Sequence, residues 1–132
     1  MSNVGEGTLV YSRYRGDFKL IVEVDPGIAV FYRTLIPKSV SIQSPKYTPH
    51  ITVIRKETPP HLYIWDAHQS ETIRFEYNSN ICNNDVYWWL PVVCPQLNKI
   101  RQALGLPEWS ELSRPPDGSD NFHITIGNTK NV

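Results

Sequence analysis

The tripeptide His-Ile-Thr occurs twice in this chain, each time inside an apolar segment with the sequence of a β-strand. The first copy, residues 50–52, lies in TPHITVIR, and the second, residues 123–125, lies in NFHITIGN. Side chains of a strand alternate between its two faces, so the His and the Thr of each copy point to one side and the Ile to the other. Where two such strands lie near one another, two imidazoles and two hydroxyls meet in one cleft.

The segment up to the first copy predicts two strands, a helix and the strand that carries the copy. Asp25 is suited to cap a helix whose first residue is Pro26, because a proline at that position lacks only an N–H that has no partner in the helix. The strands are rich in β-branched and aromatic residues. The predicted elements are strands at 8–14, 18–24 and 50–55 and a helix at 26–35.

The second half repeats these signals and ends in the second copy. It predicts strands at 62–65, 72–77, 86–93 and 122–127 and a helix at 95–104. Pro91 limits its strand to an edge or a terminus of a sheet, and Gly105 is suited to end the helix. No change of composition separates the halves, so we expect one α+β domain over residues 1–132.

Composition and charge exclude several partners. Thirteen Lys and Arg balance thirteen Asp and Glu among 132 residues, which does not suit a protein that binds long duplex DNA but leaves a small anionic ligand open. No segment has the roughly 18–20 apolar residues of a membrane span, and the N-terminal residues lack the apolar core of a signal peptide. Cys82 and Cys94 form no CxxC, so we expect reduced thiols in a cytoplasmic protein without a membrane partner. The oligomeric state stays undetermined.

Paired imidazoles and hydroxyls suit phosphoryl chemistry that needs no metal and no other cofactor. One neutral imidazole can take a proton from the attacking oxygen while the other, protonated, gives a proton to the leaving oxygen. An ordinary histidine titrates near pH 6.5, so both protonation states are accessible close to neutral pH. Threonine hydroxyls can donate hydrogen bonds to phosphoryl oxygens as charge builds on them. The candidate catalytic residues are His50, Thr52, His123 and Thr125.

Each copy also has a simpler interpretation. A histidine in a strand is most often a packed side chain, and a third His-x-Ser/Thr sequence, residues 68–70, lies in a polar segment that we assign to a loop. Two identical copies at corresponding points of two similar halves favour a functional pair. A metal site of His50, His123 and a carboxylate is a further alternative, although neither copy contains an Asp or Glu or the spacing of paired metal ligands.

The paired apolar-His-x-Thr segments in an α+β chain resemble the 2H phosphoesterase superfamily. That superfamily includes cyclic nucleotide phosphodiesterases, tRNA-splicing phosphodiesterases and LigT-like 2′-5′ RNA ligases. The resemblance implies a bilobal fold with two antiparallel sheets around a central cleft and flanking helices. It also implies that His50 and His123 are the acid–base pair, that Thr52 and Thr125 bind the phosphate, and that no metal takes part.

In size and in the segment PHITVIRKE, the chain resembles a small phage branch of the superfamily. That branch contains anti-CBASS phosphodiesterases, which degrade the cyclic oligonucleotides of bacterial antiphage signalling. The resemblance therefore implies a cyclic oligonucleotide substrate and, for a phage protein, the cytoplasm of the bacterial host.

Aromatic residues are candidates for binding the bases of such a nucleotide, because bases stack on flat side chains. We expect Tyr11 and one of the adjacent pair Trp88 and Trp89, with Trp88 as the choice, to serve this purpose. Packing in the core is the alternative for each of them.

Basic residues after the first copy are candidates for a second phosphate. Arg55 and Lys56 follow the copy directly, and strict alternation puts Lys56 rather than Arg55 on the face of His50. A pair of solvated charges is the alternative. The loop at residues 114–121 precedes the second copy, and its Pro and Gly residues suit a shaped turn that borders the cleft.

Three classes of function follow from these residues. The first is a metal-independent phosphodiesterase of cyclic oligonucleotides, with a 2′,3′-cyclic or 2′-5′ RNA phosphodiester as the alternative substrate. The second is a protein that binds and sequesters the nucleotide without cleaving it. The third is the metal site, which loss of activity in EDTA and its return with zinc would indicate.

Overall fold

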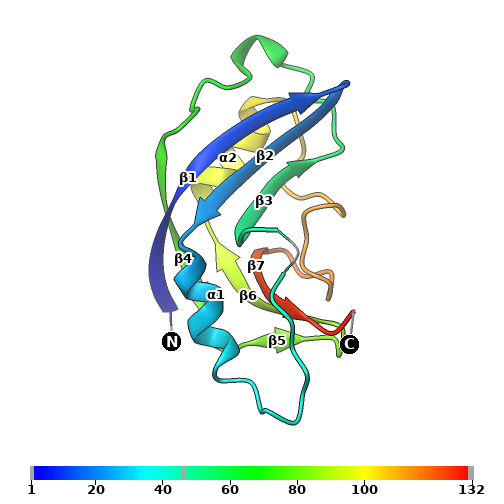
Figure 1. Cartoon of the computed structure of the whole chain (residues 1–132). Coiled ribbons are helices and arrows are strands. Elements are labelled where there is room, and N and C mark those ends of the chain that lie inside the picture. The colour runs from blue at the N-terminus through cyan, green and yellow to red at the C-terminus, as the bar shows by residue number, and fades with distance from the viewer. Residues whose placement is uncertain (1, 46, 131–132) are drawn as a thin grey trace.

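The computed structural model describes residues 2–45 and 47–130, which form one antiparallel sheet and two α-helices (Figure 1). The first half contains β1 (Ser2–Tyr14), β2 (Asp17–Val24), α1 (Pro26–Arg33) and β3 (His50–Arg55). A 3₁₀ turn (Leu62–Ile64) connects it to the second half. That half contains β4 (Thr72–Asn78), β5 (Cys82–Asn83), β6 (Tyr87–Val93), α2 (Pro95–Ala103) and β7 (Phe122–Asn128).

All described strands belong to a single sheet, in the order β4-β1-β2-β3-β7-β6-β5. β4 pairs with β6 as well as with β1, so the sheet closes on itself. β3 and β7 pair at its centre and join the two halves. The expected two sheets are therefore wrong for this structure, because two long-range pairings, β1–β4 and β3–β7, link what local sequence patterns describe as two units.

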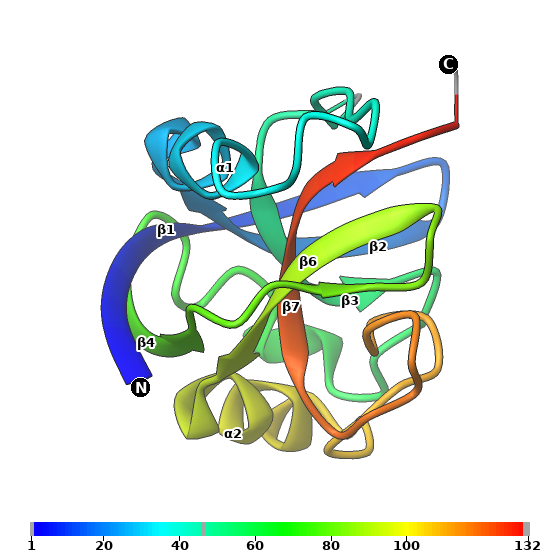
Figure 2. The same cartoon turned by 90° about the horizontal axis from the view of Figure 1, so that it is seen from below.

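The core consists of apolar side chains that alternate along the strands. In β2, Phe18, Leu20, Val22 and Val24 are buried while the residues between them are more exposed. The helices pack at different places. α1 lies near β7 and buries Ala29 and Tyr32, although Phe31 is exposed. α2 lies near β3 and buries Leu97 and Ile100. Figure 2 shows α1 and α2 on opposite sides, with β7 running between them.

The helix ends agree with the sequence signals. Asp25 caps α1, and its Oδ1 accepts a hydrogen bond of 2.8 Å from the Gly27 amide. Gly105 follows α2 with a φ of 87°, and the amides of Gly105 and Leu106 donate to the carbonyls of Gln102 and Arg101. This pattern is the Schellman motif, which satisfies the last carbonyls of a helix.

Several predicted strands differ in the structure. Residues 62–65 form the 3₁₀ turn and its end rather than a strand, because their apolar residues do not alternate and no strand pairs with them. β1 begins at Ser2 instead of residue 8, since its pairing with β4 extends it through two glycines that have weak strand propensity.

Pro91 lies in the middle of β6 and not at an end of the strand. It lies opposite His123 of β7. On the other side of β6, the described pairings with β5 involve Trp88 and Trp89, and those with β4 involve Val92 and Val93. The sheet thus has a local edge at Pro91, and this edge tolerates a residue without an N–H.

Among residues 2–45 and 47–130, no helix is long and apolar enough to cross a membrane.

Candidate active site

The two His-Ile-Thr copies meet because β3 and β7 are antiparallel neighbours with the two isoleucines directly opposite one another. Ile51 pairs with Ile124, and both side chains are fully buried. Extended by one residue in each direction, this register places His50 opposite Thr125 and Thr52 opposite His123. Directly opposite side chains share a face, with Cβ atoms about 4.5–5.5 Å apart. Each imidazole therefore lies across from the hydroxyl of the other copy.

A β-bulge follows the threonine in both copies. In β3, Ile21 of the neighbouring strand pairs with Thr52 and Leu20 pairs with Ile54, so Val53 is the extra residue. In β7, Trp89 pairs with Thr125 and Trp88 pairs with Gly127, so Ile126 is the extra residue. A bulge breaks the alternation of side chains along a strand. The next polar residue on the motif's face is therefore three positions after the threonine, at 55 and 128.

These side chains line one pocket with a volume of about 760 Å³. Each motif strand contributes three residues to it, namely His50, Thr52 and Arg55 from β3 and His123, Thr125 and Asn128 from β7. The loop before β3, the loop before β7, the start of β6 and Lys130 after β7 supply the rest of the wall. The candidate catalytic residues are therefore together at one concave surface, on two strands that hold them rigidly.

His50 is held at the pocket by the backbone just before β3. Its Nδ1 lies 2.8 Å from the carbonyl oxygen of Thr48. A carbonyl can only accept a hydrogen bond, so Nδ1 carries a proton. The Nε2 atom of His50 is then the one that can exchange a proton with a bound molecule.

His123 is in a different environment, although it belongs to the same tripeptide. The pKa of His123 is lowered to about 4, chiefly by burial and then by the charge of nearby His50, while Asp117 and the backbone of Ser113 act in the opposite direction. Its Nδ1 is buried, and no described residue forms a hydrogen bond of normal geometry with it. At neutral pH, His123 is therefore a neutral imidazole that can accept a proton.

The loop before β7 forms one wall of the pocket, as the sequence predicted for residues 114–121. Arg114 and Pro116 line the pocket. The Arg114 guanidinium is held by ion pairs with Glu111 and, at 2.8 Å, with Asp120. Asp117 accepts hydrogen bonds from the amide and hydroxyl of Ser119, which hold the pKa of its carboxyl below the ordinary value. The wall therefore carries a cation whose orientation is fixed.

The two aromatic residues expected to stack on bases lie elsewhere. Tyr11 is buried and packs edge-on against Trp65, with ring centroids 5.0 Å apart. Trp88 is only 6% exposed. Neither residue lines the pocket. Both predictions are wrong for this pocket because the apolar faces of β1 and β6 turn into the core.

The prediction that Lys56 rather than Arg55 shares the face of His50 is also wrong. Arg55 lines the pocket, whereas Lys56 does not. The bulge at Val53 moves residue 55 to the motif's face, and Lys56 has a φ of 53° that takes the chain out of the strand. Strict alternation failed here because a bulge has no signal in a single sequence.

The structure adds pocket residues that the sequence analysis did not select. Tyr47 and Tyr87 supply aromatic walls, and Lys130 adds a cation whose Nζ lies 4.8 Å from the centre of the Tyr87 ring. Arg114 and Pro116 lay in the loop that the sequence placed at the cleft. Tyr87 is near the start of a predicted strand, but nothing local distinguishes it from the core aromatics beside it.

The described side chains contain no cluster of metal ligands. Within the described ranges 2–45 and 47–130, no three His, Cys, Asp or Glu side chains lie close enough together to hold an ion. The polar groups that face the pocket from β3 and β7 are imidazole, hydroxyl, guanidinium and amide. These groups are suited to an anion.

Comparison with known proteins adds a family match. A family model described as "Swiss Army Knife, 2H phosphoesterase domain" matches residues 29–132. No curated protein and no solved structure matches the chain. The matched segment includes β3, β7 and every residue that lines the pocket.

Proposed function

Since this chain belongs to the 2H phosphoesterase family, we propose that its pocket hydrolyses a phosphodiester bond of a small cyclic nucleotide without a metal ion. One observation supports this most strongly: both histidines and both threonines of the two copies line the same pocket. The two imidazoles supply an acid and a base, and the hydroxyls supply hydrogen-bond donors for a phosphoryl group.

The environments of the histidines support different roles for them. His123 is the base: its low pKa leaves it neutral, so it takes a proton from water as the water oxygen bonds to phosphorus. His50 is the acid in its protonated form: Nδ1–H is held by the Thr48 carbonyl, and Nε2–H gives its proton to the oxygen that leaves phosphorus. Proton exchange with solvent then restores both rings. Thr52 and Thr125 donate hydrogen bonds to the non-bridging oxygens.

The rest of the pocket supports a substrate with more than one phosphate. Arg55 and Lys130 line the pocket in addition to the two copies, as does Arg114, whose charge is paired with Glu111 of the same pocket and with Asp120. Arg55 and Lys130 are therefore cations beyond the groups needed for one phosphoryl centre. Tyr47 and Tyr87 replace Tyr11 and Trp88 as the proposed surfaces for bases. We therefore propose a cyclic oligonucleotide of bacterial antiphage signalling as the substrate, cleaved in the cytoplasm of a bacterial host.

A turnover assay by liquid chromatography in EDTA tests this proposal. The panel contains 3′,3′- and 2′,3′-cGAMP, cyclic di- and tri-adenylate, 2′,3′-cAMP and 2′-5′ oligoadenylate. The inactive control is His50→Ala/His123→Ala. The matched control is His68→Ala, which removes an exposed histidine from the third His-x-Ser/Thr sequence, outside the pocket.

We expect cleavage of a cyclic oligonucleotide by the wild-type protein and by His68→Ala, and none by the double variant. Cleavage confined to 2′,3′-cAMP or to 2′-5′ linkages would contradict the proposed substrate and indicate an RNA-type phosphodiester. Binding without turnover would indicate a sequestering protein. Activity lost in EDTA and restored by zinc would contradict the metal-independent mechanism.

A further inference from the structure

Two arginine side chains bind the carbonyl groups of the two bulged residues. The Nη1 atom of Arg33 donates a hydrogen bond of 2.8 Å to the carbonyl of Ile126, the extra residue of β7. The Nη1 atom of Arg101 donates a hydrogen bond of 2.8 Å to the carbonyl of Val53, the extra residue of β3. Both copies therefore have the same arrangement, in which a helix arginine holds the residue directly after the threonine.

The two contacts cross between the halves of the chain. Arg33 is the last residue of α1, in the first half, and it binds β7 in the second half. Arg101 lies in the last turn of α2, in the second half, and it binds β3 in the first half. This agrees with the packing of α1 near β7 and of α2 near β3. Each helix thus fixes the motif strand of the opposite half.

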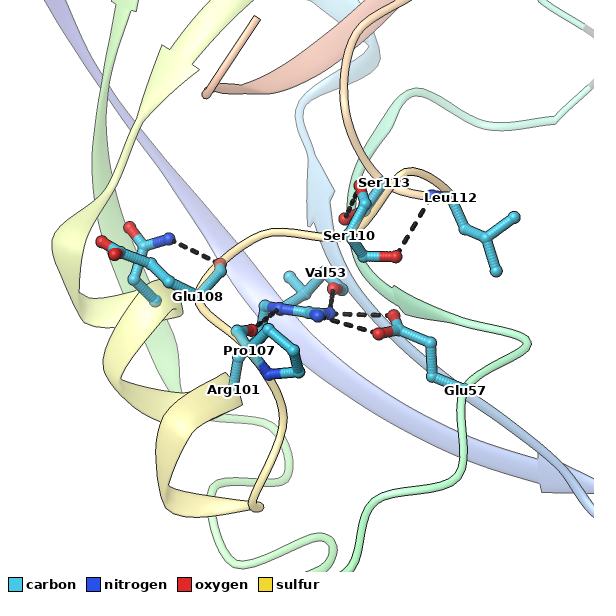
Figure 3. Close-up of polar contacts among 9 residues, drawn as sticks. Val53, Glu57, Arg101, Pro107, Glu108, Ser110, Leu112 and Ser113 are labelled. Carbon is cyan, nitrogen blue, oxygen red and sulfur yellow. Dashed lines mark hydrogen bonds and ion pairs between the residues drawn. The ribbon is translucent and has the colours of Figure 1, made fainter. Parts of the chain in front are cut away.

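Burial and several hydrogen bonds fix the position of the Arg101 side chain (Figure 3). Its side chain is fully buried, and Glu57 binds it through two hydrogen bonds of 2.9 and 2.8 Å. Its Nε donates to the carbonyl of Pro107 at 2.8 Å. A buried ion pair contributes little net stability compared with apolar packing of the same volume, but its bidentate geometry is specific. The two hydrogen bonds with Glu57 therefore fix the guanidinium in the orientation in which Nη1 donates to the carbonyl of Val53.

The bulges determine which side chains face the pocket. A regular strand would carry residues 54 and 56 on the face of Thr52, and residues 127 and 129 on the face of Thr125. The bulges bring Arg55 and Asn128 there instead, and both line the pocket. A carbonyl held by an arginine is a direct restraint on this shifted backbone.

We infer that Arg33 and Arg101 are positioning residues that hold the two bulges and, through them, the polar side chains of each motif strand in the pocket. For catalysis this inference rests on the proposed function. Neither arginine belongs to the acid–base pair. Each acts through the backbone carbonyl that it binds.

Arg33 gives the clearer test because its side chain is only half-buried, so its variants are expected to fold. Arg33→Gln shortens the side chain and removes the charged donor, whereas Arg33→Lys keeps one cationic donor for the carbonyl of Ile126. Arg74→Gln is the matched control, since Arg74 is exposed and its ion pair with Glu6 is long, at 4.0 Å. Arg101→Lys is made in parallel for the other bulge.

We expect kcat of Arg33→Gln to fall by about tenfold while KM changes less, because small displacements of positioned groups strongly reduce the rate of the chemical step. Arg33→Lys should recover part of the loss, and Arg74→Gln should behave as the wild type. An Arg33→Gln protein with a lowered melting temperature and unchanged kcat would show that the contact is only structural, and would overturn the inference.

Amide hydrogen exchange separates failure of this inference from failure of the proposed function. If the wild-type protein turns over no member of the nucleotide panel, the proposed function fails and exchange decides the positioning role. The inference predicts that the amides of residues 126–128 exchange faster in Arg33→Gln than in the wild type. Arg33→Lys should partly reverse this change. Such a result would support the role of Arg33 in restraining the bulge of β7. Unchanged exchange at these residues in Arg33→Gln overturns the inference. This outcome does not depend on whether the Arg101→Lys protein folds.

Discussion

His50 and His123 show how one tripeptide acquires two chemical characters. His50 lies at the start of β3, where a backbone carbonyl binds its Nδ1. His123 lies under the loop before β7, where burial is the main cause of its lowered pKa. The sequence could assign both residues to one site, but it could not distinguish the two environments on which the proposed acid and base roles depend. That difference depends on how deeply His123 is buried, which the pattern of the neighbouring loop does not reveal.

The lowered pKa of His123 predicts how the stability of the protein depends on pH. The folded imidazole titrates near pH 4, and an unfolded one near pH 6.5. Between these values the unfolded chain binds a proton that the folded protein does not bind. The free energy of unfolding therefore has the full contribution of neutral His123 above about pH 6.5 and loses it as the pH falls towards 4.

Urea unfolding of the wild type and of His123→Gln from pH 4 to pH 7.5 measures this effect. We expect the wild type to lose more stability on acidification than the variant, which lacks the titrating ring. His61→Gln, which removes an exposed histidine, is the control and should follow the wild type. Equal acid dependence of wild type and His123→Gln would contradict the assignment of a low pKa to His123.

At the scale of the strands, the bulges decide which side chains reach the pocket. Val53 and Ile126 look like ordinary strand residues, so the sequence analysis placed Lys56 on the motif's face where the structure has Arg55. The same limitation applies to Asn128. The strands themselves were predictable, because alternation and β-branched residues extend over several positions.

Gly127 marks a close contact between β7 and the segment before β3. A Cβ at this position would lie 2.4 Å from Cγ2 of Ile42 and 3.0 Å from the carbonyl oxygen of Gln43. Gln43 forms a β-bridge with Asn128, and both residues line the pocket. A methyl group at residue 127 must therefore displace one edge of the pocket.

We expect Gly127→Ala to lower the free energy of unfolding by about 1–3 kcal/mol, as overpacking does, and to raise KM because the pocket edge moves. Gly16→Ala is the control, because we expect it to lower the free energy of unfolding by a similar amount at a site away from the pocket. Gly16 lies in the β1–β2 turn with a φ of 86°, and an added Cβ there would contact no other part of the chain within 4 Å. An alanine there costs roughly 1–2 kcal/mol. Chemical unfolding and steady-state kinetics measure both variants. Unchanged KM in Gly127→Ala, or an equal change in Gly16→Ala, would argue against this role of Gly127.

At the scale of the whole molecule, the two halves are joined at the site itself. β3 and β7 pair at Ile51 and Ile124, and α1 and α2 each hold the motif strand of the other half through an arginine. The sequence predicted the two similar halves because each is defined by local patterns. It could not predict the single sheet, since the β1–β4 and β3–β7 pairings join residues far apart in the chain.

The pocket also has a part that local sequence patterns predict and a part that depends on the tertiary structure. The His-Ile-Thr copies in the pocket were predictable because they carry a specific pattern. Tyr87 reaches the pocket because β6 pairs with β7, where Tyr87 lies opposite Asn128, and Lys130 follows β7 and lies over the Tyr87 ring. Tyr11 and Trp88 were expected at the pocket, but both are buried in the core. An aromatic residue on a predicted strand has two faces available, and only the tertiary structure reveals which face is the core.

Turnover by His50→Ala and His123→Ala, each measured separately on the substrate that the wild type cleaves, decides whether the two copies form one acid–base site. We expect each substitution to lower kcat by roughly 10²–10⁴-fold, the range for loss of a positioned acid or base, and Thr52→Ala and Thr125→Ala to lower it less. His68→Ala should retain the wild-type rate, and melting temperatures identify any variant that is unfolded. A folded His50→Ala or His123→Ala protein with wild-type kcat would contradict the paired acid–base site.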